Sequence, residues 1–160
     1  MTNILKKVQI YTDGSCLGNP GAGGYGALLV YGEHKQELSG GFRLTTNNRM
    51  EMMGAIAALE YLDMPCNVDL YTDSQYIVNA MTKGWAKRWQ ANNWKRNAKD
   101  MAENPDLWQK ILDLCGEHKV NFHWVRGHAG HPENEYCDRL AVKAANGSNL
   151  PVDSGYKPKK

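Results

Sequence analysis

The chain has 160 residues, of which 42% are hydrophobic and 22% charged, and its formal net charge is +2 at neutral pH. These values are ordinary for one globular domain, and no apolar run approaches the roughly 20 residues needed to span a bilayer. Residues 1–7 lack the apolar core and cleavage site of a signal peptide, so we expect a cytoplasmic protein. We also expect a monomer that does not associate with membranes. The small net charge neither indicates nor excludes a nucleic-acid partner, which depends on where the charges lie.

The first third of the sequence predicts an antiparallel meander. Alternating hydrophobicity predicts three strands, over residues 8–13, 25–31 and 38–44. A glycine-rich loop over 17–24 lacks the Gly-Lys-Ser/Thr ending of a P-loop and precedes a strand, so a plain turn is favoured over nucleotide binding. The first strand ends in Asp13, directly before a turn at Gly14.

The middle of the sequence alternates helices with a strand. Apolar residues at helical spacing predict a helix that follows the cap candidates at 45–48 and carries Glu51 near the edge of its buried face. A short strand over 68–72 follows and ends in Asp73, and Ser74 can cap the next helix. Helix–strand alternation after a meander implies parallel pairing, so the sheet should be mixed. For Glu51 alone, first-turn dipole stabilisation is the alternative explanation.

Basic residues and tryptophans are interleaved between residues 83 and 99. The cations are Lys83, Lys87, Arg88, Lys95, Arg96 and Lys99, and the tryptophans are Trp85, Trp89 and Trp94. One interpretation is an amphipathic helix that docks its tryptophans in the core. The other is a nucleic-acid grip, in which cations neutralise phosphates and an indole packs on a sugar or base. The two interpretations are compatible if one tryptophan anchors the helix in the core and another contacts the nucleic acid.

The last third predicts a helix, a strand and a final helix. The helix covers 107–115, where Gly116 stops it, the strand covers 120–124, and the final helix starts at Pro132. The loop over 126–132 contains His128. From residue 146 onward the chain is rich in Gly, Ser, Asn, Pro and Lys. We therefore expect one domain over residues 1–146 and a loosely ordered tail without a core role over 147–160.

Carboxylates at strand ends and on helices predict a metal site. Asp13 and Asp73 end strands, and Glu51 and Asp138 lie on predicted helices. Held together without a cation, these groups would repel one another and their pKa values would rise. The cysteines occur singly, which is typical of reduced thiols rather than of zinc ligands. The candidate metal ligands are therefore carboxylate oxygens, and oxygen ligands select Mg²⁺ or Mn²⁺. Two such ions can activate water and stabilise a leaving oxygen in phosphoryl displacement.

Four motifs, in order along the chain, resemble those of bacterial type 1 ribonuclease H. They are Tyr11-Thr12-Asp13-Gly14-Ser15, Thr46-Asn47-Asn48-Arg49-Met50-Glu51, Tyr71-Thr72-Asp73-Ser74, and Gly127-His128-Ala129-Gly130-His131-Pro132-Glu133-Asn134 with Asp138 following. The resemblance implies an α/β, ribonuclease H-like fold with a mixed five-stranded sheet flanked by helices. It also implies endonucleolytic cleavage of the RNA strand of RNA/DNA hybrids with Mg²⁺ or Mn²⁺, two ions acting during catalysis. The products of that family carry a 5′-phosphate and a 3′-hydroxyl.

The resemblance also assigns roles to individual residues. Asp13, Glu51, Asp73 and Asp138 match the metal-binding and catalytic carboxylates, and His128 matches a loop histidine involved in proton handling or product release. Cys16, Asn19, Asn47, Asn48 and Gln75 match substrate-facing positions, Trp85 matches a residue that contacts the DNA strand, and Thr46 with Asn104 matches a phosphate pocket. Lys87 and Arg88 are added as substrate-binding candidates because they belong to the basic segment around Trp85. For Cys16, a small buried side chain without a binding role is an equal alternative.

The chain departs from the family pattern between its second and third basic-segment tryptophans. It has Gln90-Ala91-Asn92-Asn93 where bacterial relatives commonly carry basic residues, and an extra glycine at Gly84. We therefore expect weaker hybrid binding than in a strongly basic relative. Two other hypotheses are another nuclease or strand-transfer enzyme of the wider superfamily, and a non-catalytic binder of hybrids or double-stranded RNA, which need not retain four carboxylates.

Overall fold

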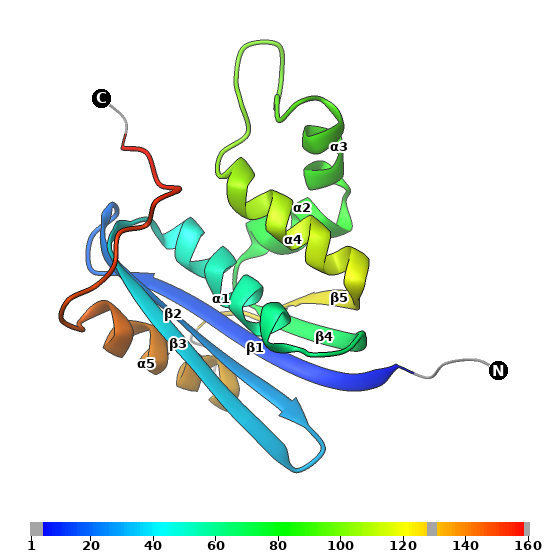
Figure 1. The fold of residues 1–160 in the computed structure, drawn as a ribbon, viewed down its shortest axis with the longest axis vertical. Helices are drawn as coiled ribbons and strands as arrows, with labels where there is room; N and C mark the ends of the chain where they lie inside the picture. The colour runs from blue at the N-terminus through cyan, green and yellow to red at the C-terminus, as the bar shows by residue number, and fades with distance from the viewer. Residues whose placement is uncertain (1–4, 128–130, 159–160) are drawn as a thin grey trace.

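The computed structural model describes residues 5–127 and 131–158, and a five-stranded sheet with helices on both faces forms its centre (Figure 1). In chain order the elements are β1 (Lys6–Cys16), β2 (Gly21–Tyr31), β3 (His34–Thr45), α1 (Asn47–Tyr61), β4 (Cys66–Thr72), α2 (Gln75–Thr82), α3 (Trp85–Ala91), α4 (Pro105–Glu117), β5 (Lys119–Trp124) and α5 (Pro132–Ala145). The sheet order is β3-β2-β1-β4-β5. Because β1, β2 and β3 pair antiparallel and β1, β4 and β5 parallel, the predicted mixed sheet is confirmed.

Helix caps lie where the sequence predicts them. The Thr46 hydroxyl accepts the Arg49 N–H at 3.2 Å at the start of α1, and the Ser74 hydroxyl accepts the Ile77 N–H at 3.3 Å at the start of α2. Each cap satisfies a backbone donor that the helix itself leaves unpaired. None of the helices in the described ranges is long and apolar enough to cross a membrane.

Several elements extend beyond the predicted boundaries. Strand β2 begins at Gly21 rather than at Tyr25, because β1 continues to Cys16 and its backbone pairs with the glycines at 23 and 24. Backbone pairing needs no side-chain alternation, so the hydrophobic pattern does not reveal it. Helix α4 continues through Gly116 to Glu117, and the His118 N–H still reaches the Leu114 carbonyl at 3.1 Å.

The sheet is packed on both faces. Helix α1 covers the face that presents Val8, Ile10 and Val68, while α5 covers the opposite face of β1, β2 and β3. On that second face a Cβ at Gly26 would lie 2.5 Å from the Cys137 carbonyl oxygen. The α5 backbone therefore rests directly on β2, which brings the first turns of α5 beside the end of β1.

The segment after α5 packs against the domain, in contrast to the loose tail that its composition predicts. Asp153 is buried and accepts hydrogen bonds from Arg49 Nε at 2.7 Å and from the Thr45 hydroxyl at 2.7 Å. Arg49, only 2% exposed, also contacts Asp106 through Nη2 at 2.8 Å. A buried guanidinium needs counterions, and the C-terminal segment supplies one of them. The domain boundary at residue 146 stays a prediction.

Candidate active site

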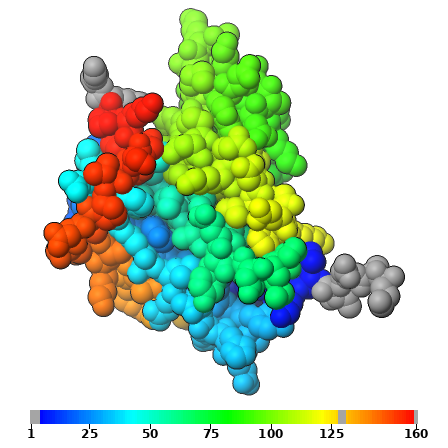
Figure 2. Space-filling model, in the orientation of Figure 1, coloured from blue at the N-terminus to red at the C-terminus, as the bar shows by residue number. Residues whose placement is uncertain are grey.

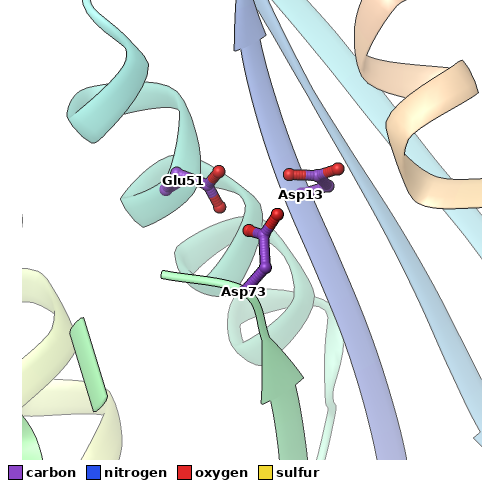
Figure 3. Close-up of side chains that lie close together, drawn as sticks. All are labelled: Asp13, Glu51 and Asp73. Carbon is purple, nitrogen blue, oxygen red and sulfur yellow. The ribbon is translucent and has the colours of Figure 1, made fainter. Parts of the chain in front are cut away.

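Three carboxylates from different elements converge at one edge of the sheet. Asp13 lies near the end of β1, Asp73 directly follows β4, and Glu51 points from the first turns of α1 toward both (Figure 3). One ligand atom of each lies within 4.8 Å of the others. Because β1 and β4 are adjacent parallel strands, their carboxyl ends meet at the same edge, so two segments sixty residues apart deliver aspartates to one place.

A close approach between β1 and α1 brings Glu51 to the two aspartates. A Cβ at Gly14 would lie 2.8 Å from the Met50 Cβ and still closer to the backbone that joins Met50 to Glu51. Only glycine leaves room for the helix at this distance. The turn residue that follows Asp13 in the sequence therefore also sets the distance between strand and helix.

Burial and the charges of neighbouring carboxylates raise the pKa values of Asp13 and Glu51. Burial, followed by the negative charge of Asp73, raises the pKa of Asp13 to about 7. Burial also raises the pKa of Glu51 well above its usual range, and the charges of Asp13 and Asp73 add to the effect. The Glu51 Oε2 atom is buried without a hydrogen-bond partner among the described residues. An oxygen-only cluster with an unpartnered buried oxygen fits a hard divalent cation.

The raised pKa values predict that the metal-free protein becomes less stable as the pH rises. Between the unfolded pKa of Asp13, near 3.8, and the folded value of about 7, the native state holds a proton that the unfolded chain has released. Stability is therefore lost across that window, by about 4 kcal/mol for Asp13. In EDTA, urea unfolding should give a higher free energy of unfolding at pH 5 than at pH 8.

The Asp13→Asn variant is the control for this pH dependence. It removes the titrating group, so its free energy of unfolding in EDTA should vary less between pH 5 and pH 8 and exceed the wild-type value at pH 8. A wild-type protein equally stable at both pH values would contradict the electrostatic description of the cluster.

Two further residues, Asp138 and His128, are predicted to act in catalysis. Asp138 lies on α5, half-buried, and does not belong to the group whose ligand atoms lie within 4.8 Å. Its negative charge nevertheless contributes to the raised pKa of Asp13, so it faces the same site. His128 lies outside the described residues. Both assignments stay predictions.

Hydrogen bonds join three of the predicted substrate-facing residues near the cluster. The Cys16 N–H donates to Asn47 Oδ1 at 2.9 Å, and the Asn47 N–H donates to Asn19 Oδ1 at 3.1 Å, which ties the β1–β2 loop to the start of α1. Asn48 and Gln75 are exposed in the first turns of α1 and α2. Burial raises the pKa of the half-buried Cys16 thiol to about 11, so it stays protonated near neutral pH.

Helix α3 and the loop after it form a basic projection, which stands out from the body in Figure 2. Trp89 is 9% exposed and packs edge-on against Trp108, with ring centroids 6.0 Å apart, so it anchors the helix. Trp85 is half-buried, and the Lys83 ammonium lies 5.7 Å from its ring centroid. Lys87 and Arg88 are exposed. The two interpretations of the tryptophans are therefore compatible: one anchors and the other remains accessible.

Helix α3 and the loop after it line an open hollow of about 410 Å³. It is lined by Arg88, Trp89, Ala91, Asn92, Lys95 and Arg96. Arg96 lies 3.7 Å from Asp100, an acidic residue just past the basic segment, so part of the positive charge is neutralised. Gly84 precedes α3 with a φ of +78°, a backbone conformation that favours glycine and explains its presence here.

Sequence reasoning missed the residues that hold Asp73 in place. The Trp124 indole N–H donates to the Asp73 carbonyl oxygen at 3.2 Å, and a Cβ at Gly127 would lie 2.8 Å from Asp73 Oδ2. The Tyr11 and Tyr71 rings stack across β1 and β4. The repeated Tyr-Thr-Asp at 11–13 and 71–73 is the one signal in the sequence that could have indicated a shared arrangement.

A mixed sheet with clustered carboxylates at its edge and a separate basic projection agrees with what the sequence motifs predict for a hydrolase of nucleic acids. The protein-family model described as RNase H matches residues 5–146. The chain belongs to the RNase H family, as its motifs predict.

Individual relatives agree with this membership over nearly the whole chain. A ribonuclease H of Rippkaea orientalis is 67% identical over 159 residues, which cover 99% of this chain and 98% of the relative. A ribonuclease HI of Synechocystis sp. is 59% identical over 158 residues, 98% of each chain. The prediction of a bacterial type 1 enzyme is thus confirmed.

Solved structures show the same fold. LC9-RNase H1, described as a type 1 RNase H with the type 2 active-site motif, is 37% identical with a TM-score of 0.81, over 91% of this chain and 74% of that chain. LC11-RNase H1, solved in complex with an RNA/DNA hybrid, is 25% identical with a TM-score of 0.65, over 86% of this chain and 96% of that chain. The ribonuclease H-like fold class is therefore confirmed.

Proposed function

We propose that this chain is an endoribonuclease that hydrolyses the RNA strand of RNA/DNA hybrids at the cluster of Asp13, Glu51 and Asp73. The observation that carries the proposal is the convergence of these carboxylates within 4.8 Å at the sheet edge, in a chain of the RNase H family. The proposed products carry a 5′-phosphate and a 3′-hydroxyl. LC11-RNase H1, with the same fold, binds such a hybrid in its solved structure.

The proposed cofactor is Mg²⁺, with Mn²⁺ as a substitute and two ions during catalysis. Asp13, Glu51 and Asp73 would hold it, with Asp138 as a fourth ligand. When bound, the ions activate a water and stabilise the leaving oxygen of the displaced phosphodiester. Their positive charge also offsets the burial and repulsion that raise the pKa values of Asp13 and Glu51, so these groups are ionised in the loaded enzyme.

The proposed substrate surface extends from the carboxylates to the basic projection. Cys16, Asn19, Thr46, Asn47, Asn48 and Gln75 would face the minor groove and the RNA strand, whose 2′-hydroxyls separate RNA from DNA. The DNA strand would be contacted by Trp85, Lys87 and Arg88. A phosphate of the substrate would be bound by Thr46 and Asn104. Arg49 Nη1 donates to Asn104 Oδ1 at 3.1 Å, and because a guanidinium only donates, the amide nitrogen of Asn104 is the group left for a substrate oxygen. His128 would handle a proton or assist product release.

The assay that tests this function compares duplexes of the same sequence. Labelled RNA/DNA hybrid, DNA/DNA and RNA/RNA are incubated with and without Mg²⁺, and the RNA strand of the hybrid alone should be cut, only with the metal. Binding of the hybrid without Mg²⁺-dependent scission would favour the non-catalytic binder. Cleavage of DNA strands would favour another nuclease of the superfamily.

The basic projection should control hybrid affinity rather than chemistry. Replacing Lys87, Arg88, Lys95 and Arg96 by alanine should raise KM and reduce the slope of log affinity against log salt by roughly one for each phosphate that the variant no longer neutralises. The turnover rate at saturating hybrid should stay near the wild-type value. Fluorescence anisotropy with a labelled hybrid at several salt concentrations measures the slope.

A matched variant controls for loss of overall charge. It replaces exposed lysines elsewhere on the surface, namely Lys35, Lys110, Lys119 and Lys143. This variant should retain most of the wild-type slope. If the projection variant and the wild type show the same slope of log affinity against log salt, α3 and its loop are not the hybrid-binding segment.

For location and assembly we propose a cytoplasmic monomer. The four cysteines, Cys16, Cys66, Cys115 and Cys137, are all free thiols, which fits a reducing compartment.

A further inference from the structure

The backbone pairing between β1 and β4 ends before the strands reach their aspartates. Its last pair is Tyr11 with Tyr71, so Asp13 and Asp73 each lie two residues beyond it. The charge of Asp73 raises the pKa of Asp13, so the two carboxylates repel each other when both are ionised. The separation of the two aspartates is therefore set outside the β1–β4 ladder, by the pairing of β1 with β2, by the contacts between β4 and β5, and by neighbouring side chains.

A row of three stacked aromatic rings crosses β1, β4 and β5 at the Tyr11–Tyr71 pair. The Tyr11 and Tyr71 rings lie 5.0 Å apart with an interplanar angle of 14°, and Tyr71 lies 4.9 Å from the His123 ring at 21°. His123 Nε2 is 2.9 Å from Asp69 Oδ1, which holds the outer end of the row. Because Tyr11 and Tyr71 precede Asp13 and Asp73 by two residues, each ring stands on the same face of its strand as the aspartate.

Asp73 is tied to β5 beyond the point where β4 leaves β1. The Val125 N–H donates to the Thr72 carbonyl at 2.9 Å, and the Trp124 indole N–H donates to the Asp73 carbonyl at 3.2 Å. Trp124 is 48% exposed, so its position is not explained by burial in the core. Its hydrogen bond holds the backbone that carries the Asp73 carboxylate.

We propose that Tyr71, stacked on Tyr11, and Trp124, bonded to the Asp73 backbone, are positioning residues that set the separation of Asp13 and Asp73 and thereby the affinity for Mg²⁺. The inference rests on the proposed function, because it assumes that the carboxylates bind the metal. Neither side chain is assigned as a ligand. They act by limiting the movement of one ligand relative to the other, which lowers the cost of assembling the site around an ion.

Calorimetric titration of the metal-free protein with Mg²⁺ tests the proposal without relying on activity. Trp124→Phe keeps an aromatic ring but loses the N–H donor, and Tyr71→Ser removes the ring that stacks on Tyr11. Each should weaken Mg²⁺ binding by about tenfold, the low end of the range for removal of groups that support metal ligands. Cleavage by both variants should recover at high Mg²⁺, with KM for the hybrid unchanged.

Two controls separate positioning from general stability. Tyr71→Phe keeps the stacked ring and should bind Mg²⁺ with wild-type affinity. Tyr31→Ser makes the same chemical change at an exposed tyrosine on β2 and should also leave the affinity unchanged. If Tyr71→Ser fails to fold, Trp124→Phe decides the matter alone.

The outcomes distinguish this inference from the function on which it rests. Wild-type affinity in Trp124→Phe and in folded Tyr71→Ser would overturn the positioning role and leave the proposed active site intact. A wild-type protein that binds no Mg²⁺ would instead overturn the metal site itself. A loss of thermal stability with unchanged Mg²⁺ affinity would show that the aromatic groups are structural only, which also overturns the inference.

Discussion

Asp13→Asn should reduce Mg²⁺-dependent cleavage of an RNA/DNA hybrid by roughly a thousandfold or more while the fold remains intact. The amide is nearly isosteric with the carboxylate, so packing around the buried side chain is preserved. It nevertheless replaces a charged metal ligand with a neutral one, at the centre of a cluster in which each carboxylate lies close to the other two. Single-turnover cleavage of a labelled hybrid measures the loss.

A matched substitution at the surface controls for this result. Asp63 is exposed, in the turn between α1 and β4, and Asp63→Asn should leave the cleavage rate within about twofold of wild type. The circular dichroism spectra of both variants should match that of the wild type. Cleavage by Asp13→Asn within tenfold of the wild-type rate would falsify the assignment of Asp13 as an essential ligand.

Gly14→Ala should damage both stability and the metal site through a single methyl group. The new Cβ would meet the backbone between Met50 and Glu51 and lie 2.8 Å from the Met50 Cβ, and none of these atoms can rotate away. Helix α1 must shift away from β1, which costs about 3 kcal/mol of unfolding free energy and moves Glu51 away from Asp13. Urea unfolding and Mg²⁺ calorimetry measure the two effects.

The comparison variant is Gly116→Ala, at a glycine with open space around it near the end of α4. A Cβ there meets no other atom within 4 Å, and alanine favours a helix more than glycine does. This variant should therefore be stabilised by up to about 1 kcal/mol and bind Mg²⁺ like the wild type. If Gly14→Ala behaves in the same way, the close approach of β1 and α1 does not control the site.

The pH dependence and the Gly14→Ala effect share one cause, which is that the site gathers buried carboxylates before a metal is present. The close contact of Gly14 with the backbone of α1 holds Glu51 near Asp13, although burial and the neighbouring negative charges raise the pKa values of both carboxylates. A bound divalent cation would relieve the repulsion between these charges. Stability in EDTA and metal affinity should therefore change in opposite directions when a carboxylate is neutralised, and in the same direction when the packing is disturbed.

Local patterns in the sequence determined the helices and strands, and they also determined the strand ends that carry the aspartates. Alternating residues marked β1 and β4, and each strand ends close to the aspartate that its pattern places there. Thr46 and Ser74 marked the starts of α1 and α2, because a capping side chain acts within three residues of its own position. Asp13, Glu51 and Asp73 could be grouped in advance since parallel strands place their ends at one edge.

Contacts between distant segments were decided only by the tertiary structure. Composition predicted a loose tail after residue 146, whereas Asp153 of that segment is a counterion of the buried Arg49, 104 positions away. The same holds for Trp124, whose strand pattern gives no sign that its indole reaches the Asp73 carbonyl. Periodicity reports which face of an element is buried, but it does not report which partner a polar group meets there. The predicted metal ligands were therefore visible in the sequence, and the contacts made by the residues around them were not.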